Sequence, residues 1–138
     1  MMNIEDPKKE RERMRMKYAA KDELFHYPPC LVPAWEPLID EMIELIEEWN
    51  DTESNQLRFF QIKEKFGMMV VYLEPTDGSG VVSTPMHIQD AVNSIANNGI
   101  KICKICGERK VQTVVESRLQ WKCIDHWNEK QWFAVRGL

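Results

Sequence analysis

The chain has 138 residues, a formal net charge of −4 and an apolar fraction of 43%. This length suits one domain, or one domain with a small appended module, and the apolar fraction is ample for a core. No apolar run reaches the roughly 20 residues that a membrane-spanning helix needs. The acidic net charge also argues against a general attraction of the whole chain to nucleic acid.

Charge is segregated along the chain. Seven basic and two acidic residues lie between Lys8 and Lys21, and eight basic and four acidic residues lie from Lys101 to the end. Between Glu36 and Glu53 there are eight acidic residues and no basic residue. We therefore expect local patches of opposite sign on a mildly acidic protein.

The first segment, residues 1–26, is predicted to be a basic helical arm. Residues 8–25 are mainly good helix formers, and Met14, Tyr18 and Phe25 recur at spacings of about one and two helical turns. This thin apolar stripe allows only narrow packing on the domain. An arm that is disordered, or ordered only by a partner, is the alternative.

A proline-containing connection follows, and then the clearest amphipathic helix of the chain. The helix is predicted to begin at Trp35, with Pro37 in its first turn and an apolar stripe that includes Met42 and Trp49. Its acidic side is expected to be a solvated face. The alternative is a surface that docks a basic protein or imitates a nucleic-acid backbone, built from Asp40, Glu44, Glu47, Glu48 and Asp51.

The middle of the chain predicts a β-hairpin followed by a second amphipathic helix. Strands are expected at residues 57–63 and 68–73, and Gly67 suits a positive φ in the tight connection. The second strand is almost continuously apolar, which indicates coverage on both faces. The helix is predicted from Ser83 to Asn98. His26 has no partner at motif spacing and is expected to be incidental. His87, in the first turn of this helix, is expected to be exposed and not catalytic, because no acid or nucleophile lies near it by spacing.

The C-terminal third carries the strongest motif. Cys103 and Cys106 form a Cys-x-x-Cys pair followed by Gly107, and Cys123 and His126 follow two short predicted strands at residues 111–115 and 119–122. This spacing matches a tetrahedral zinc site. We predict a structural Zn²⁺ in a treble-clef-like module over residues 101–138, with a helix running from Cys123. A disulfide or redox pair is the alternative.

The expected fold is therefore α+β, with helices packed on a central β-hairpin over residues 27–100 and the zinc module sharing its core. A disulfide would need an oxidising compartment, and the charged N-terminal sequence does not read as an export signal. A cytoplasmic location is expected.

Four features occur together between Trp35 and His126. They are the helix start Trp35-Glu-Pro-Leu, the string I-K-E-K-F-G ending at Gly67 before an apolar strand, a short helix, and the late cysteine and histidine pairs. This combination resembles a group of small phage and prophage proteins that has no assigned activity. In that group the string commonly continues G-L-R-F-Y, whereas M-M-V-V-Y follows here, without the second glycine. The resemblance implies a fold and a phage origin, with location in the infected or lysogenic bacterial host.

The sequence does not point to an enzyme. It has no Gly-rich phosphate loop, no nucleophile elbow and no His-x-Glu to complete a zinc-deaminase pattern. We expect a non-catalytic accessory protein that binds a host or phage protein, in host takeover or anti-defence. Its contacts would come from the acidic helix face and from Trp127 and Trp132, although these tryptophans also suit packing over the zinc hairpin. The alternative is nucleic-acid binding, with Trp121 or Trp127 stacking on bases and charge supplied by Lys101, Lys104, Arg109, Lys110, Arg118 and Lys122.

Overall fold

The computed structural model describes residues 7–65 and 67–99 and two further strands, with side chains described for residues 8–65 and 67–99. No helix in this described part is both long enough and apolar enough to cross a membrane. The elements in chain order are α1 (Pro7–Ala19), η1 (Asp22–Leu24), η2 (Pro33–Trp35), α2 (Glu36–Thr52), β1 (Leu57–Lys65), β2 (Met68–Pro75), η3 (Val81–Ser83), α3 (Met86–Asn97), β3 (Val111–Val115) and β4 (Arg118–Lys122).

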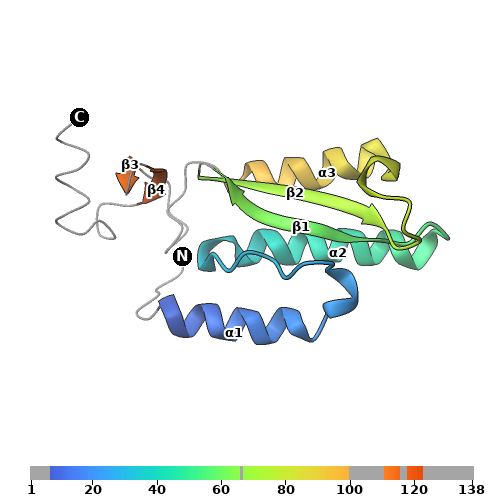
Figure 1. Cartoon of the computed structure of the whole chain (residues 1–138), viewed down its shortest axis with the longest axis horizontal. Coiled ribbons are helices and arrows are strands. Elements are labelled where there is room, and N and C mark those ends of the chain that lie inside the picture. Colours follow the sequence, from blue (N-terminus) through green and yellow to red (C-terminus); the bar gives the residue numbers. More distant parts are fainter. Residues whose placement is uncertain (1–6, 66, 100–110, 116–117, 123–138) are drawn as a thin grey trace.

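An antiparallel hairpin of β1 and β2 forms the centre of the fold (Figure 1). Leu57 lies opposite Pro75 at the open end, and Lys65 lies opposite Met68 next to the turn. Gly67 in this turn has a φ of 80°, a conformation that glycine adopts without the steric penalty of a side chain. The predicted hairpin and the role of Gly67 are confirmed.

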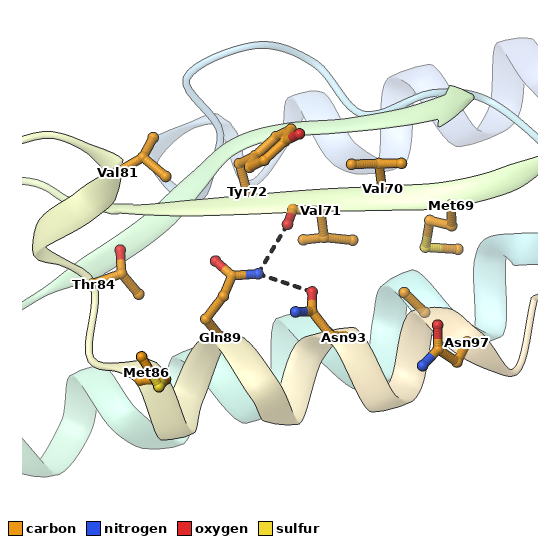
Figure 2. Close-up of a pocket in the computed structure, with 11 residues that line it drawn as sticks. Met69, Val70, Val71, Tyr72, Val81, Thr84, Met86, Gln89, Asn93 and Asn97 are labelled. Atoms are coloured by element: carbon orange, nitrogen blue, oxygen red, sulfur yellow. Dashed lines mark hydrogen bonds between the residues drawn. The ribbon is translucent and has the colours of Figure 1, made fainter. Parts of the chain in front are cut away.

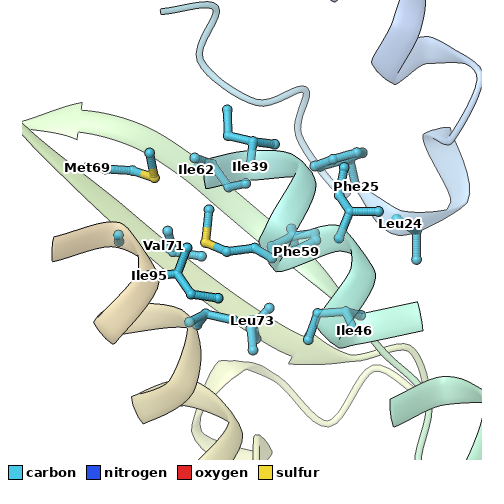
Figure 3. Close-up of a cluster of buried hydrophobic side chains, with 14 of the residues drawn as sticks. Leu24, Phe25, Ile39, Ile46, Phe59, Ile62, Met69, Val71, Leu73 and Ile95 are labelled. Carbon is cyan, nitrogen blue, oxygen red and sulfur yellow. The ribbon is translucent and has the colours of Figure 1, made fainter. Parts of the chain in front are cut away.

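Two amphipathic helices, α2 and α3, pack on one face of the hairpin and on each other. Side chains of alternate β2 residues, Met69, Val71 and Leu73, are buried against this layer together with Phe59 and Ile62 of β1. Figure 3 shows these side chains converging with those of α2 and α3. The predicted α+β class, with helices packed on a β-hairpin, is confirmed.

The prediction that β2 is covered on both faces is wrong. Met68 and Tyr72 are 40% and 39% exposed, while the residues between them alternate toward the core. The reason is that α2 and α3 both lie on the same face of the hairpin. An apolar run shows that a strand can be buried, but it does not show how many helices cover each face.

The first helix also ends earlier than predicted. α1 stops at Ala19, and the chain turns through η1 so that Phe25 reaches the hairpin and stacks on Phe59 with 5.3 Å between ring centroids. The following backbone runs along the outer edge of β1. The N–H groups of His26 and Cys30 donate hydrogen bonds to the carbonyls of Phe59 and Ile62, at 2.8 and 3.0 Å. Main chain therefore closes this edge of the sheet.

The strands β3 and β4 pair antiparallel, with Val111 opposite Lys122 and Val115 opposite Arg118. They coincide with the two strands predicted between the cysteine pairs, except that the second begins one residue earlier. The zinc ligands and the helix predicted from Cys123 lie outside the described residues.

Truncation of Phe59 tests the packing of the core. Phe59 is fully buried, so we expect Phe59→Ala to lower the free energy of unfolding by about 3 kcal/mol or more, through lost burial and a residual cavity. Urea denaturation measures this. Val82→Ala, at an exposed position, is the control and should change it by less than about 0.5 kcal/mol. A loss below about 1 kcal/mol for Phe59→Ala would contradict the packing.

Candidate functional site

A groove of about 570 Å³ lies between β2 and α3, along the edge of the hairpin that faces away from β1 (Figure 2). Met69, Val71 and Tyr72 line its strand side, and Met86, Gln89 and Asn93 are among the residues that line its helix side. None of the residues that line the groove is charged. A volume of this size falls within the range of about 300–1,000 Å³ that is typical of ligand sites.

Side chains, rather than another strand, form hydrogen bonds with some of the backbone groups at the β2 edge. Gln89 Nε2 donates a hydrogen bond to the carbonyl of Val71 at 2.9 Å, and the N–H of Leu73 donates to Gln89 Oε1 at 3.2 Å. The Thr84 hydroxyl donates to the carbonyl of Leu73 at 3.0 Å. A side-chain amide carries the same donor and acceptor types as a peptide group. Gln89 therefore occupies the position of a neighbouring strand's backbone.

No side chain of the described residues covers the remainder of this edge in the same way. Backbone groups of successive strand residues point alternately to the two sides, and the register places Val70 and Tyr72 opposite Lys63 and Gln61. The peptide groups of Met69 and Val71 consequently face the groove. Among the described residues, no hydrogen bond reaches the N–H or carbonyl of Met69 or the N–H of Val71, and no further strand pairs with β2.

The rim of the groove combines exposed apolar side chains with a row of amides. Met86 at the start of α3 is 77% exposed, and Tyr72 on the strand side of the groove is 39% exposed. Gln89 Nε2 also donates to Asn93 Oδ1 at 3.0 Å, which fixes the orientation of the Gln89 amide. Sequence reasoning missed this site. The available signal was the four-residue spacing of Gln89, Asn93 and Asn97, which places uncharged amides on one side of a helix.

The acidic residues proposed for partner docking do not form one free surface. Lys17 Nζ lies 2.6 Å from Asp40 Oδ2, and Lys21 Nζ lies 3.1 Å from Glu47 Oε1. The protein's own basic helix thus covers part of the acidic side of α2, and Figure 1 shows α1 alongside α2. The acidic residues Glu44, Glu48 and Asp51 are exposed and form no ion pair with a described residue.

Glu36 is the centre of the contact between α1 and α2. It is only 8% exposed, and it accepts hydrogen bonds from Arg13 at 2.6 and 2.9 Å and from Lys17 at 2.9 Å. The hydrogen bonds from Arg13 are the main reason why the pKa of Glu36 is lowered. Met14 and Tyr18 of α1 are buried in the same core as the hairpin. The helical part of the N-terminal segment therefore packs on the domain.

His26 is not incidental, which corrects the expectation from the sequence. Its Nδ1 lies 2.8 Å from Glu74 Oε1, and Arg58 Nε donates to the same oxygen at 2.7 Å. Burial opposes ionisation of Glu74, but these hydrogen bonds outweigh it and lower the pKa of the carboxyl. The cluster ties the segment after η1 to both strands. His87 is exposed, as expected, and its ring lies against that of Trp49, with 5.6 Å between ring centroids.

The remaining predicted site residues cannot be placed with these. Arg118 and Lys122 are the terminal residues of β4. Within the part of the chain that has described side chains, no group of three or more His, Cys, Asp or Glu residues could hold a metal ion. The other candidates lie outside the described residues: Cys103, Cys106, Cys123, His126, Trp127, Trp132, Lys101, Lys104, Arg109 and Lys110.

Comparisons with known proteins add no relative. No protein-family model, no curated protein and no solved structure matches the chain. The resemblance to small phage proteins stays a prediction.

The pH dependence of stability tests the Glu36 cluster. Because the pKa of Glu36 lies below its usual value of 4.5 in the folded state, the folded state takes up the proton less readily than the unfolded state. Its stabilisation is therefore complete above about pH 5 and is lost as the pH falls below 4.5. Glu36→Gln should lower stability by about 1–2 kcal/mol at pH 7, and by progressively less below pH 4.5.

Urea denaturation at pH 7 and at pH 3 measures both effects. The matched control is Glu12→Gln, which removes an exposed ion pair with Arg15 on the same helix and should cost less than about 0.5 kcal/mol. Equal losses for the two variants at pH 7 would show that Glu36 does not hold α1 on α2.

Proposed function

We propose that this protein is a non-catalytic binding module that holds a segment of a partner protein in the groove between β2 and α3. The observation that carries the proposal is the part of the β2 edge, at Met69 and Val71, that no described residue covers, inside an uncharged groove. Proteins usually protect open edges with charged side chains, prolines or a covering element. Exposed Met86 and Tyr72 beside the edge supply the apolar contacts that are typical of binding surfaces.

The biological setting is proposed from the resemblance. The resemblance supports a phage-encoded accessory protein in the cytoplasm of a bacterial host. The partner would be a host or phage protein, and the role would be host takeover or anti-defence. The acidic residues that α1 leaves exposed, Glu44, Glu48 and Asp51, would attract basic regions of such a partner and raise the association rate. Trp127 and Trp132 remain candidates for further contacts.

A structural zinc ion belongs to the proposal as well. Cys103, Cys106, Cys123 and His126 have the spacing of a complete tetrahedral ligand set. Such a set leaves no coordination position for a water molecule or substrate, so this zinc would stabilise the C-terminal third and would not take part in catalysis.

Nucleic-acid binding is the second candidate, supported by the basic balance of residues 101–138. A gel shift with generic single- and double-stranded oligonucleotides at increasing salt separates the two candidates. Phosphate-dominated binding weakens steeply with salt. We expect no shift at 50 mM salt, and a salt-sensitive shift would favour the second candidate.

Two exposed methionines provide a matched test of the groove. Peptides that bind the full chain are selected from a displayed library. Their affinity is then measured for the variants Met86→Glu and Met16→Glu, which add the same charge at positions that are 77% and 70% exposed. Met86→Glu places a carboxylate on the rim of the uncharged groove and should weaken binding at least about tenfold, because a bound apolar segment would desolvate it. Met16→Glu on α1 should leave affinity unchanged. Equal effects of the two substitutions would contradict the proposed site.

Removal of one cysteine tests the metal. The purified chain should contain one zinc ion, and Cys106→Ser should lose it and unfold the region from residue 100 onward. Metal analysis and the thermal transition of the same samples measure this. A Cys106→Ser protein with full thermal stability and no metal would show that the zinc is not structural.

A further inference from the structure

The hydrogen bonds of Gln89 indicate what kind of partner segment the groove takes. Its side-chain amide bonds to the carbonyl of Val71 and the N–H of Leu73, one donor and one acceptor contact on the same edge of β2. A paired strand would make contacts of the same type with these two groups. The backbone N–H and carbonyl of Met69 and the N–H of Val71 lie farther along the same edge of β2, inside the groove.

From this arrangement, and resting on the proposed function, we infer that the partner segment is an extended, uncharged peptide strand that pairs with the β2 edge and displaces the Gln89 side chain. A strand supplies alternating donors and acceptors along a line, as the edge requires. A helix cannot do so, because its backbone groups bond within the helix. Met69 to Leu73 spans about 13 Å, at about 3.3 Å per residue, so a guest of about five residues covers it.

The lining determines the chemistry of the guest. Its strand side presents Met69 and Val71, its helix side presents the amides of Asn93 and Asn97, and no charged residue lines it. A charged guest side chain would lose hydration there without gaining an ion pair. Uncharged amides suit an uncharged guest, because they can bond to its polar groups without an ion pair.

A second copy of this protein is a poorer occupant than a partner segment. In each copy α3 packs against β2, and Gln89 occupies part of the edge. Edge-to-edge pairing of two copies would bring two α3 helices and two Gln89 side chains to the same place. An isolated strand brings no helix with it and enters without that conflict.

Peptide backbone methylation tests the strand pairing. The probe is a fluorescein-labelled, uncharged heptapeptide selected on the full chain and sensitive to Met86→Glu. N-methylation removes an N–H donor, and alternate residues of a strand direct their N–H groups to opposite edges. Methylation of one alternate set should abolish binding measured by fluorescence anisotropy, while methylation of the other set should weaken it less than about threefold. A lysine at the central position should weaken it at least about tenfold.

A substitution of Gln89 tests whether the guest displaces the Gln89 side chain. Gln89→Ala leaves the Val71 carbonyl and the Leu73 N–H available, so the guest no longer competes with a side chain. We expect the heptapeptide to bind roughly five- to tenfold more tightly, about what release of one or two hydrogen bonds provides. Asp90→Ala, at the adjacent exposed position on α3 that does not line the groove, should bind as the unaltered protein does. Circular dichroism checks that both variants fold.

The outcomes separate this inference from the proposed function. If selected peptides bind and depend on Met86 but tolerate both methylation patterns, the strand pairing is wrong and the protein-binding function stands. Weaker or unchanged binding to Gln89→Ala shows that Gln89 is not displaced. If no peptide binds and sedimentation shows a dimer that Met86→Glu dissociates, a second copy occupies the groove and both proposals fail.

Discussion

A two-stranded sheet has two edges whose N–H and carbonyl groups need partners, and this protein satisfies its two edges differently. Backbone after η1 covers the outer edge of β1, held by His26 and Arg58 on Glu74. Among the described residues, the edge of β2 receives hydrogen bonds from the side chains of Gln89 and Thr84 alone, at Val71 and Leu73. A side chain can leave an edge at the cost of a few hydrogen bonds, whereas a covalently continuous segment cannot leave without disrupting the fold. This asymmetry of the edges is the reason why we propose the β2 edge as the binding site.

The second organising contact is electrostatic. α1 has little apolar surface, and Met14 and Tyr18 are its buried side chains. The acidic side of α2 supplies the remaining attraction through Glu36, Asp40 and Glu47. Because the basic side chains in these pairs are 40–47% exposed, each pair contributes modestly, and the nearly buried Glu36 contributes most. The same contact occupies Glu36, Asp40 and Glu47, and it leaves the groove as the main uncovered feature among the described residues.

The parts of the fold that the sequence predicted are those with local causes. The apolar stripe of α2 and the positive φ of Gly67 each depend on residues within one element, so periodicity and turn chemistry identify them. The pairing of Lys17 with Asp40 and the contact between His26 and Glu74 join distant segments, and no local pattern encodes them. Gln89 was missed for the same reason, because its role depends on how α3 lies against the β2 edge. The cysteine and histidine spacing is local and strong, and its zinc site stays a prediction.

Amide hydrogen exchange of the ¹⁵N-labelled full chain tests the central claim most directly, since it reports on each backbone N–H of β2. The N–H groups of Val70 and Tyr72 face β1, while those of Met69 and Val71 face the groove. We expect Met69 and Val71 to exchange at least about tenfold faster than Val70 and Tyr72, and to become protected when a peptide binds. Equal protection of all four in the protein alone would mean that the β2 edge is already paired, and would contradict an open edge as the binding site.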